Sequence, residues 1–184
     1  MAGVSTAPSF ALFDTAVGAC VLVWGEHGLV GVLLPEADAP ATRAKARRRY
    51  PGAGESTPSP AVQQVVERIQ ALLNGGRDDL EDITLDLQAI APFERRVYAV
   101  ARAIHPGHTR TYGEVATLLG DPLLARAVGQ ALGANPFPII VPCHRVLAAG
   151  SRSGGFSAPG GTRTKLRLLE IERAPLGGTP GLFD

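Results

Sequence analysis

Short apolar stretches and glycine-containing breaks alternate along the first part of the chain. The apolar stretches cover residues 10–13, 19–24 and 29–34, and residues 25–28 form one of the breaks. Apolar runs of this length, bounded by turn-forming residues, are typical of β-strands. We therefore predict that these three segments are strands of a small sheet.

Helical patterns follow these strands. Residues 41–50, which come directly after Pro40, are rich in Ala and Arg and predict a helix. From 61 to 73 the apolar residues recur at steps of three and four, as on a helix with one buried face, and glycines at 75–76 end that pattern. Residues 83–87 predict one more strand.

Three further helical patterns occupy the stretch that begins at Pro92. The first starts at Pro92 itself, and two shorter ones, at 112–119 and 124–134, are separated by the turn-forming residues 120–122. This layout is that of a helix-turn-helix. An ordinary pair of packed core helices gives the same pattern, and the spacing alone favours that plainer interpretation.

A fully apolar run at 139–141 predicts a deeply buried segment. The polar motif at 142–145 follows it at once, with a cysteine, a histidine and an arginine in succession. A glycine-rich stretch at 150–161 then separates this motif from the last predicted helix, at 162–173.

Charge divides the chain into two parts. The net charge is only +1, yet residues 1–91 contain 7 basic and 11 acidic side chains, whereas residues 92–184 contain 11 basic and 6 acidic ones. Any binding to a polyanion is therefore expected in the second part. We predict an N-terminal domain at 1–91, a C-terminal domain at 92–174 and a flexible tail, rich in Gly and Pro, at 175–184.

Composition argues against several classes of protein. No stretch approaches the roughly 18 uninterrupted apolar residues of a membrane span, and the N-terminus has no basic segment followed by a long apolar run. The two cysteines, Cys20 and Cys143, lie far apart and outside any zinc-ligand spacing, and Cys20 has only apolar neighbours. We predict a soluble cytoplasmic protein without a disulfide, metal or other cofactor.

Cys143 is the candidate reactive residue because polar side chains follow it directly. A cysteine reacts as its thiolate, and a nearby base or cation promotes that form. His144 and Arg145 adjoin it, but in an extended backbone neighbouring side chains point to opposite faces, which disfavours a direct Cys143–His144 pair. A water bridging thiol and imidazole, with a carboxylate holding the far ring nitrogen, is the more consistent arrangement.

Two glutamates of the last predicted helix could supply that carboxylate, Glu170 and Glu172. Glu172 lies four residues after Leu168 and three after Leu169, on the face that these leucines bury, so we favour Glu172. The plainer interpretation of both glutamates is a solvated surface charge, and that of Cys143 is a buried core cysteine.

Six motifs occur in order in the second half. They are Pro92-Phe93, Thr111-Tyr112-Gly113-Glu114, Arg126-Ala127-Val128-Gly129, Asn135-Pro136, Pro142-Cys143-His144-Arg145-Val146, and Leu168-Leu169 with Glu172. With them the sequence resembles the O6-alkylguanine-DNA alkyltransferases, also called methylated-DNA–protein-cysteine methyltransferases. The resemblance implies a two-domain α+β fold, with a small mixed α/β N-terminal domain like ribonuclease H. The C-terminal domain is then mainly helical, with a winged-helix-like helix-turn-helix.

The resemblance also implies a reaction. Cys143 accepts the alkyl group, His144 acts through water as its base, Glu172 orients His144, and Tyr112 donates a hydrogen bond to the departing guanine. Each molecule acts once, because nothing hydrolyses the thioether. The implied substrate is double-stranded DNA bearing O6-alkylguanine, with O4-alkylthymine as a further candidate. The implied protein is a cytoplasmic monomer, associated with the nucleoid in a prokaryote.

For DNA binding, the resemblance implies that the alkylated base leaves the duplex through the minor groove and that Arg126 fills the gap. Short side chains on the same helix suit that narrow groove. The other implied site residues are Ala125, Ala127, Gly129 and Thr111 at the DNA, Phe156, Ser157 and Val146 in the base pocket, and Asn135, Pro142 and Arg145 as structural supports.

Three other functions remain alternatives. A non-catalytic sensor would bind alkylated DNA without transfer, although the presence of Cys143 argues against it. A cysteine hydrolase using Cys143, His144 and Glu172 would need a base that later activates water on an acyl intermediate. A winged-helix-like regulator would need only the helix-turn-helix and would leave the Cys143 motif unexplained.

Overall fold

A four-stranded sheet lies at the centre of the first half of the protein. The structure, a computed structural model, describes residues 6–149 and 161–175. Its sheet has the order β3-β2-β1-β4, antiparallel except for the parallel pair of β1 and β4. The strands are β1 (Ser9–Thr15), β2 (Gly18–Gly25), β3 (Gly28–Leu33) and the two-residue β4 (Gly54–Glu55). The three strands predicted from the sequence are confirmed, and β4 is additional.

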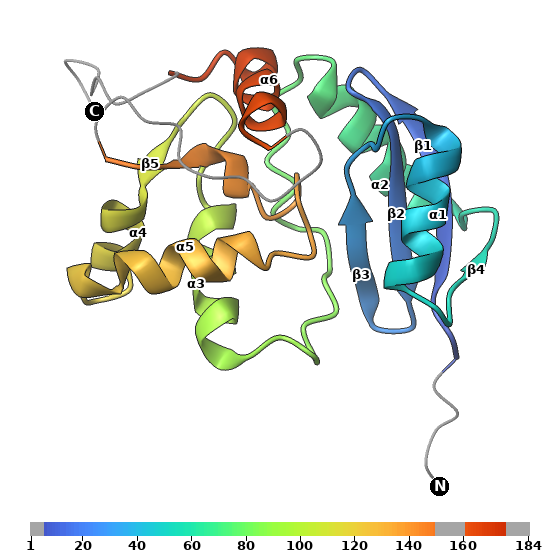
Figure 1. The fold of residues 1–184 in the computed structure, drawn as a ribbon, viewed down its shortest axis with the longest axis horizontal. Helices are drawn as coiled ribbons and strands as arrows, with labels where there is room; N and C mark the ends of the chain where they lie inside the picture. Colours follow the sequence, from blue (N-terminus) through green and yellow to red (C-terminus); the bar gives the residue numbers. More distant parts are fainter. Residues whose placement is uncertain (1–5, 150–160, 176–184) are drawn as a thin grey trace, which may run out of the picture.

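Helices cover both faces of this sheet (Figure 1). Alternation along β2 explains how: Val21 packs with Ala46 of the first helix, whereas Leu22 packs with Ile69 of the second. Side chains of Asp38 and Ser59 accept hydrogen bonds from the backbone at the two helix starts. The helices are α1 (Ala39–Arg49) and α2 (Pro60–Leu73). Both predicted helices are therefore confirmed.

The strand predicted at 83–87 is wrong. The structure gives this segment one isolated parallel bridge, between Leu29 and Leu85. Its backbone contacts with β3 are the hydrogen bonds from Leu29 N to Thr84 O (3.0 Å) and from Asp86 N to Leu29 O (2.8 Å). The segment only crosses the edge of the sheet on its way to the next helix, so its apolar residues are buried without forming a ladder.

The second half is mainly helical (Figure 1). The predicted helices are confirmed, and a short parallel pair of strands joins two loops beside them. In chain order the elements are α3 (Pro92–Arg102), β5 (Arg110–Thr111), α4 (Tyr112–Leu118), η1 (Pro122–Leu124), α5 (Ala125–Gly133), η2 (Cys143–Arg145), β6 (Val146–Leu147) and α6 (Thr162–Glu172). One hydrophobic cluster runs from the sheet through α2 into α3, α4, α5 and α6. Within 6–149 and 161–175, no helix has the length and apolar character needed to cross a membrane.

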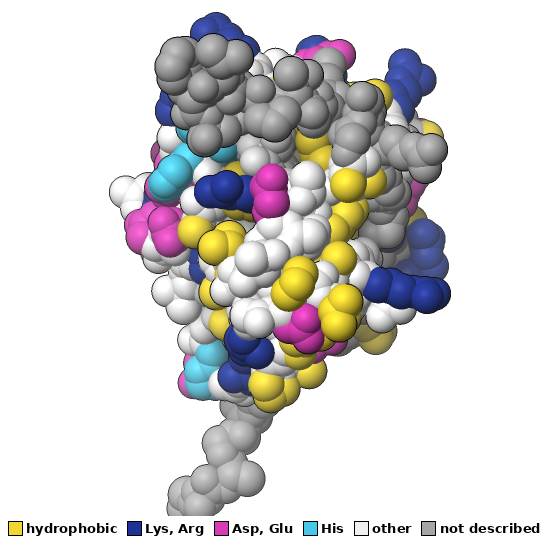
Figure 2. Space-filling view, turned by 90° about the vertical axis from the view of Figure 1, so that its left-hand side faces the viewer, with side chains coloured by type: hydrophobic (Ala, Val, Ile, Leu, Met, Phe, Trp, Pro, Cys, Tyr) yellow, Lys and Arg dark blue, Asp and Glu magenta, His cyan; other side chains and the backbone are white. Residues whose placement is uncertain are grey.

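The end of the molecule formed by α4, η1 and α5 faces the viewer in Figure 2. Helix α4 begins with a capping box, in which Thr111 Oγ1 accepts from Glu114 N and Glu114 Oε2 accepts from Thr111 N. Gly120 then takes a positive φ of 104°, and Asp121 caps η1. These local signals set α5 close against α4.

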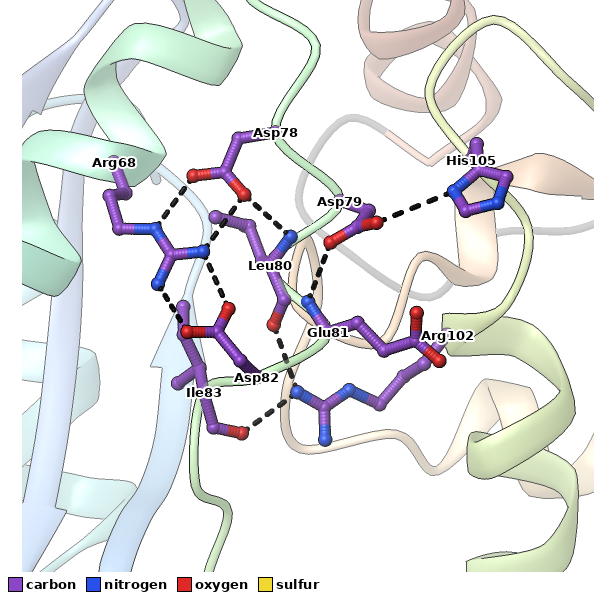
Figure 3. A network of polar contacts seen from close by, with 9 residues as sticks. All are labelled: Arg68, Asp78, Asp79, Leu80, Glu81, Asp82, Ile83, Arg102 and His105. Carbon is purple, nitrogen blue, oxygen red and sulfur yellow. Dashed lines mark hydrogen bonds and ion pairs between the residues drawn. The ribbon is translucent and has the colours of Figure 1, made fainter.

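An acidic segment, residues 78–83, ties the two halves together (Figure 3). Arg68 of α2 binds two of its carboxylates, with Nε 2.6 Å from Asp78 and Nη2 2.7 Å from Asp82. On the other side, Arg102 at the end of α3 donates to two backbone carbonyls of the segment, at 2.9 and 2.8 Å. The acidic segment thereby fixes the end of α3 against the first half.

Candidate active site around Cys143

Asn135 braces the turn that leads into the Cys143 segment. Its Nδ2 donates to Val141 O at 2.9 Å, and its Oδ1 accepts from Phe137 N at 2.9 Å. Ile139 within this turn has a positive φ of 77°, an uncommon backbone conformation for a β-branched residue. The predicted burial of residues 139–141 is confirmed. Asn135 therefore stands where the sequence analysis expects a structural support.

The backbone at Cys143 is not extended, which corrects the sequence analysis. Residues 143–145 form the short 3-10 helix η2, closed by a hydrogen bond from Arg145 N to Pro142 O at 2.9 Å. Successive side chains in such a helix point about a third of a turn apart. Cys143, His144 and Arg145 are nevertheless all buried, so the motif sits inside the protein.

Glu172, the last residue of α6, joins His144 and Arg145. Its Oε1 lies 2.8 Å from His144 Nε2, and Arg145 donates to both carboxylate oxygens, at 2.9 and 2.7 Å. Arg145 also donates to Ile104 O at 2.6 Å. Burial alone would raise the pKa of the Glu172 carboxyl, but its bonds with His144 and the guanidinium of Arg145 lower it to about 2. The structure therefore brings His144 together with Glu172, the glutamate that helical spacing favoured over Glu170.

His144 is held in its neutral form, with one ring nitrogen left as an acceptor. Burial lowers its pKa despite the opposing effect of Glu172. An ionised carboxylate only accepts hydrogen bonds, so His144 Nε2 carries the proton and Nδ1 is left as the acceptor. Nδ1 is buried and has no hydrogen-bond partner among the described residues. It is thus free to take a proton.

The Cys143 thiol lies in a setting that opposes ionisation in the resting protein. Burial raises its pKa, while hydrogen bonding from the Asn135 side chain and the positive charge of Lys165 work in the other direction. The described residues include no side-chain hydrogen bond between Cys143 and His144. By contrast, the pKa of Cys20 is raised to about 12 by burial, as expected for a structural thiol.

Lys165 is the site residue that the sequence analysis missed. It is fully buried, donates to Val146 O at 2.7 Å and lies 5.8 Å from the centre of the Tyr112 ring. Burial lowers its pKa to about 8. A sequence signal exists, because Lys165 shares the i, i+3, i+4, i+7 face of Leu168, Leu169 and Glu172. A lysine on a buried helix face is itself unusual.

Tyr112 begins α4 and lies next to α5. Burial raises the pKa of its hydroxyl, and the proximity of Cys143 adds to this. A Cβ at Gly129 of α5 would lie 3.8 Å from the Tyr112 ring, so these residues are in contact range. The Tyr112 ring therefore lies where α4 and α5 meet.

The residues predicted to bind DNA lie on α5 and at the start of α4. Arg126 is exposed, whereas Ala125 and Ala127 are half-buried. The hydroxyl of Thr111 is engaged in the capping box. Val146 is fully buried in β6, and its carbonyl accepts from Lys165. The predicted pocket residues Phe156 and Ser157 lie outside the described residues, as does the predicted tail beyond 175.

Comparisons with known proteins place the chain in a family. Residues 92–174 match the family model described as 6-O-methylguanine DNA methyltransferase, DNA binding domain. A methylated-DNA–protein-cysteine methyltransferase of Methanothermobacter thermautotrophicus is 34% identical, over 85% of this chain and 81% of the relative. The chain belongs to the family of methylated-DNA–protein-cysteine methyltransferases.

Solved structures agree with this assignment. The crystal structure of Mycobacterium tuberculosis O6-methylguanine methyltransferase superposes with a TM-score of 0.72 at 32% identity, covering 91% of this chain and 95% of that one. A structure of the Mycobacterium tuberculosis protein in complex with DNA gives a TM-score of 0.70 at the same identity and coverage. This chain therefore has the α+β fold of these methyltransferases.

Proposed function

We propose that this protein repairs DNA by direct reversal, moving an alkyl group from O6 of guanine onto Cys143. The observation that carries the proposal is the buried His144–Glu172–Arg145 network beside Cys143 in a member of this family. Burying three polar side chains costs free energy, and a charge cluster without a function could lie at the surface instead. The protein is consumed, since the thioether formed is stable.

The first step of the proposed reaction generates the thiolate. The Cys143 proton passes through a bridging water to His144 Nδ1, which is unpartnered among the described residues and belongs to a neutral ring. Glu172 stabilises the imidazolium that results, just as it fixes the resting tautomer. Arg145 keeps Glu172 ionised and aimed at His144.

Alkyl transfer follows in one displacement. The sulfur attacks the alkyl carbon, the C–S bond forms as the C–O6 bond breaks, and the electron pair goes to the guanine oxygen. Tyr112 donates a hydrogen bond to the base as this negative charge develops. The ammonium of Lys165, 5.8 Å from the centre of the Tyr112 ring, stabilises the same charge. Guanine then regains a proton at N1. In the net reaction the alkyl group and a proton change places between base and thiol.

DNA is presented to this site by the second half of the chain. In this proposal residues 1–91 are a ribonuclease H-like domain, and 92–174 a winged-helix-like one in which α4, η1 and α5 form a helix-turn-helix. The tight turn at Gly120 and the positive charge of the second half support this division. An alkylated base inside a duplex is inaccessible, so it must be extruded to reach the buried Cys143. We expect a monomer acting where the DNA is, in the cytoplasm or at a nucleoid.

One experiment tests the transfer itself. The protein is incubated with a duplex oligonucleotide containing O6-methylguanine, digested, and examined by mass spectrometry. We expect the peptide containing Cys143 to gain the mass of one methylene, and that of Cys20 to remain unchanged. Binding of the duplex without any gain would leave the non-catalytic sensor as the function.

Arg126→Ala is expected to slow transfer from duplex DNA about a hundredfold more than transfer from the free alkylated base. In this proposal Arg126, which is exposed at the start of α5, fills the gap that the extruded base leaves. Single-turnover rates on the two substrates measure the effect. Arg110→Ala, which removes another exposed arginine, serves as the control for lost charge. Equal slowing on both substrates would contradict a role for Arg126 in extrusion.

Lys165→Met is expected to slow transfer roughly tenfold at neutral pH, which corresponds to about 1.4 kcal/mol. The wild-type rate should fall as the pH rises through about 8, where Lys165 loses its charge, and the variant should lack this fall. Single-turnover rates across that pH range provide the measurement. Arg167→Met removes a cation from the exposed face of the same helix and should keep the wild-type profile. An unchanged profile in Lys165→Met would remove Lys165 from the reaction.

A further inference from the structure

Two large apolar side chains are exposed at the corner between α4 and η1. Leu118 is 63% exposed and Leu123 is 89% exposed, and they are the only exposed large hydrophobic residues in the part of the chain that the structure describes. Figure 2 looks onto this end of the molecule, where hydrophobic side chains lie at the surface among charged ones. A leucine side chain left in water forgoes the free energy that its burial would provide. The proposed function does not yet account for Leu123.

Leu123 is held in place rather than carried on a loose loop. Asp121 Oδ1 accepts from Leu123 N at 2.9 Å, and Asp121 O accepts from Leu124 N at 3.1 Å. Leu124 packs against the core, while Leu123 projects into solvent. The turn thus directs Leu124 into the interior and presents Leu123, the residue before it, to solvent.

Leu123 stands on the same side of the chain as Arg126. Residue Ala125, which joins η1 to α5, has helical backbone angles of −53° and −42°, so the two elements run on without a break. Side chains three apart in such a stretch lie on one face. The neighbours Ala125 and Ala127 are too short to reach as far. Leu123 and Arg126 are therefore the two long side chains at the start of α5.

We propose that Leu123 is a second DNA-inserting side chain, an apolar wedge at the base step next to the gap that Arg126 fills. The proposal rests on the proposed function. Proteins that bind in the minor groove frequently insert apolar side chains, leucine among them, between base steps and so unstack these steps in part. The basic second half of the chain and the adjacent Arg126 favour nucleic acid as the occupant. The wedge destabilises the stack that holds the alkylated base, and the Leu123 side chain becomes buried in the process.

Leu123→Ser tests this inference through the ratio of two single-turnover rates. One rate is methyl transfer from O6-methylguanine in a duplex, and the other is transfer from the free alkylated base, which needs no extrusion. We expect the ratio to fall about tenfold, which matches the loss of roughly 1.4 kcal/mol of apolar contact. A 2-aminopurine placed beside the lesion should brighten on binding of the wild type, as stacking is lost, and much less with the variant. Leu123→Phe, which restores a wedge, should recover the ratio.

Leu118→Ser is the matched control. It removes the other exposed leucine, which is the last residue of α4, and leaves the start of α5 unchanged. It should keep the wild-type ratio. A normal ratio in Leu123→Ser would overturn the wedge, and so would an equal fall in both variants. Sedimentation could instead show that the wild type is a dimer and that either substitution makes it a monomer. That result would overturn the wedge and identify this corner as an interface between two copies of the chain. A wild-type protein that methylates itself from neither substrate would overturn the proposed function as well, so the two failures are distinguishable.

Discussion

Replacing Cys143 with alanine will abolish alkyl transfer while binding to duplex DNA containing O6-methylguanine stays within about twofold of the wild type. The thiol supplies the bond that forms, and the only other cysteine of the chain, Cys20, lies in the strand β2. The exposed residues of α5, which carry the proposed DNA contacts, do not depend on the thiol. Transfer is measured by mass spectrometry of the protein, and affinity by fluorescence anisotropy of a labelled duplex.

Cys20→Ala provides the control for loss of a thiol. Cys20 lies in β2, is fully buried and has a pKa raised to about 12, so its removal should leave transfer intact and affect only stability. Residual methylation in Cys143→Ala would show that the acceptor has been assigned to the wrong residue. Loss of DNA binding together with transfer would mean that Cys143 is part of the scaffold rather than of the chemistry.

Most of the fold could be predicted because the local signals are strong. The helix α2 has both an apolar face and a serine cap, and α4 has a complete capping box, so neither depends on distant contacts. The segment at 83–87 could not be predicted, because its apolar residues are buried by crossing the sheet edge rather than by pairing along it. Burial is visible in a sequence, but the partner that causes it is not.

The site shows the same division between local and distant information. Helical spacing selected Glu172 over Glu170, and the 2.8 Å contact with His144 agrees with that choice. The same spacing puts Lys165 on the buried face, but a single cation on a helix is ordinarily interpreted as solvated. The bidentate contact of Arg145 with Glu172 was beyond prediction, because it depends on the turn of η2 and on the carbonyl of Ile104, two residues after α3. The role of each residue in the reaction stays a prediction.

Glu172→Gln is expected to lower the free energy of unfolding by about 3–5 kcal/mol, the range found when one partner of a buried ion pair is removed. Three N–H groups, one from His144 and two from Arg145, point at the two oxygens of this carboxylate. An amide offers one oxygen, so its NH2 group must face at least one of these donors. Urea titration measures the loss. Transfer should slow as well, because His144 loses the charge that stabilises its protonated form.

The pH dependence of stability separates this buried charge from a general packing defect. The pKa of Glu172 is about 2 in the folded protein against 4.5 for the free side chain, so its contribution is fully present above pH 4.5 and is lost as the pH falls towards 2. At about 1.4 kcal/mol per unit, the wild type loses about 3 kcal/mol over that interval through Glu172. Glu172→Gln should show a correspondingly flatter curve, retaining only the acid sensitivity of groups such as Asp78, whose pKa is lowered by Arg68. Glu170→Gln, at an exposed position of the same helix, should reproduce the wild-type curve. Parallel curves for wild type and Glu172→Gln would show that the carboxylate is not held ionised by Arg145 and His144. His144, the proposed base, would then have no carboxylate to fix its tautomer and stabilise its protonated form.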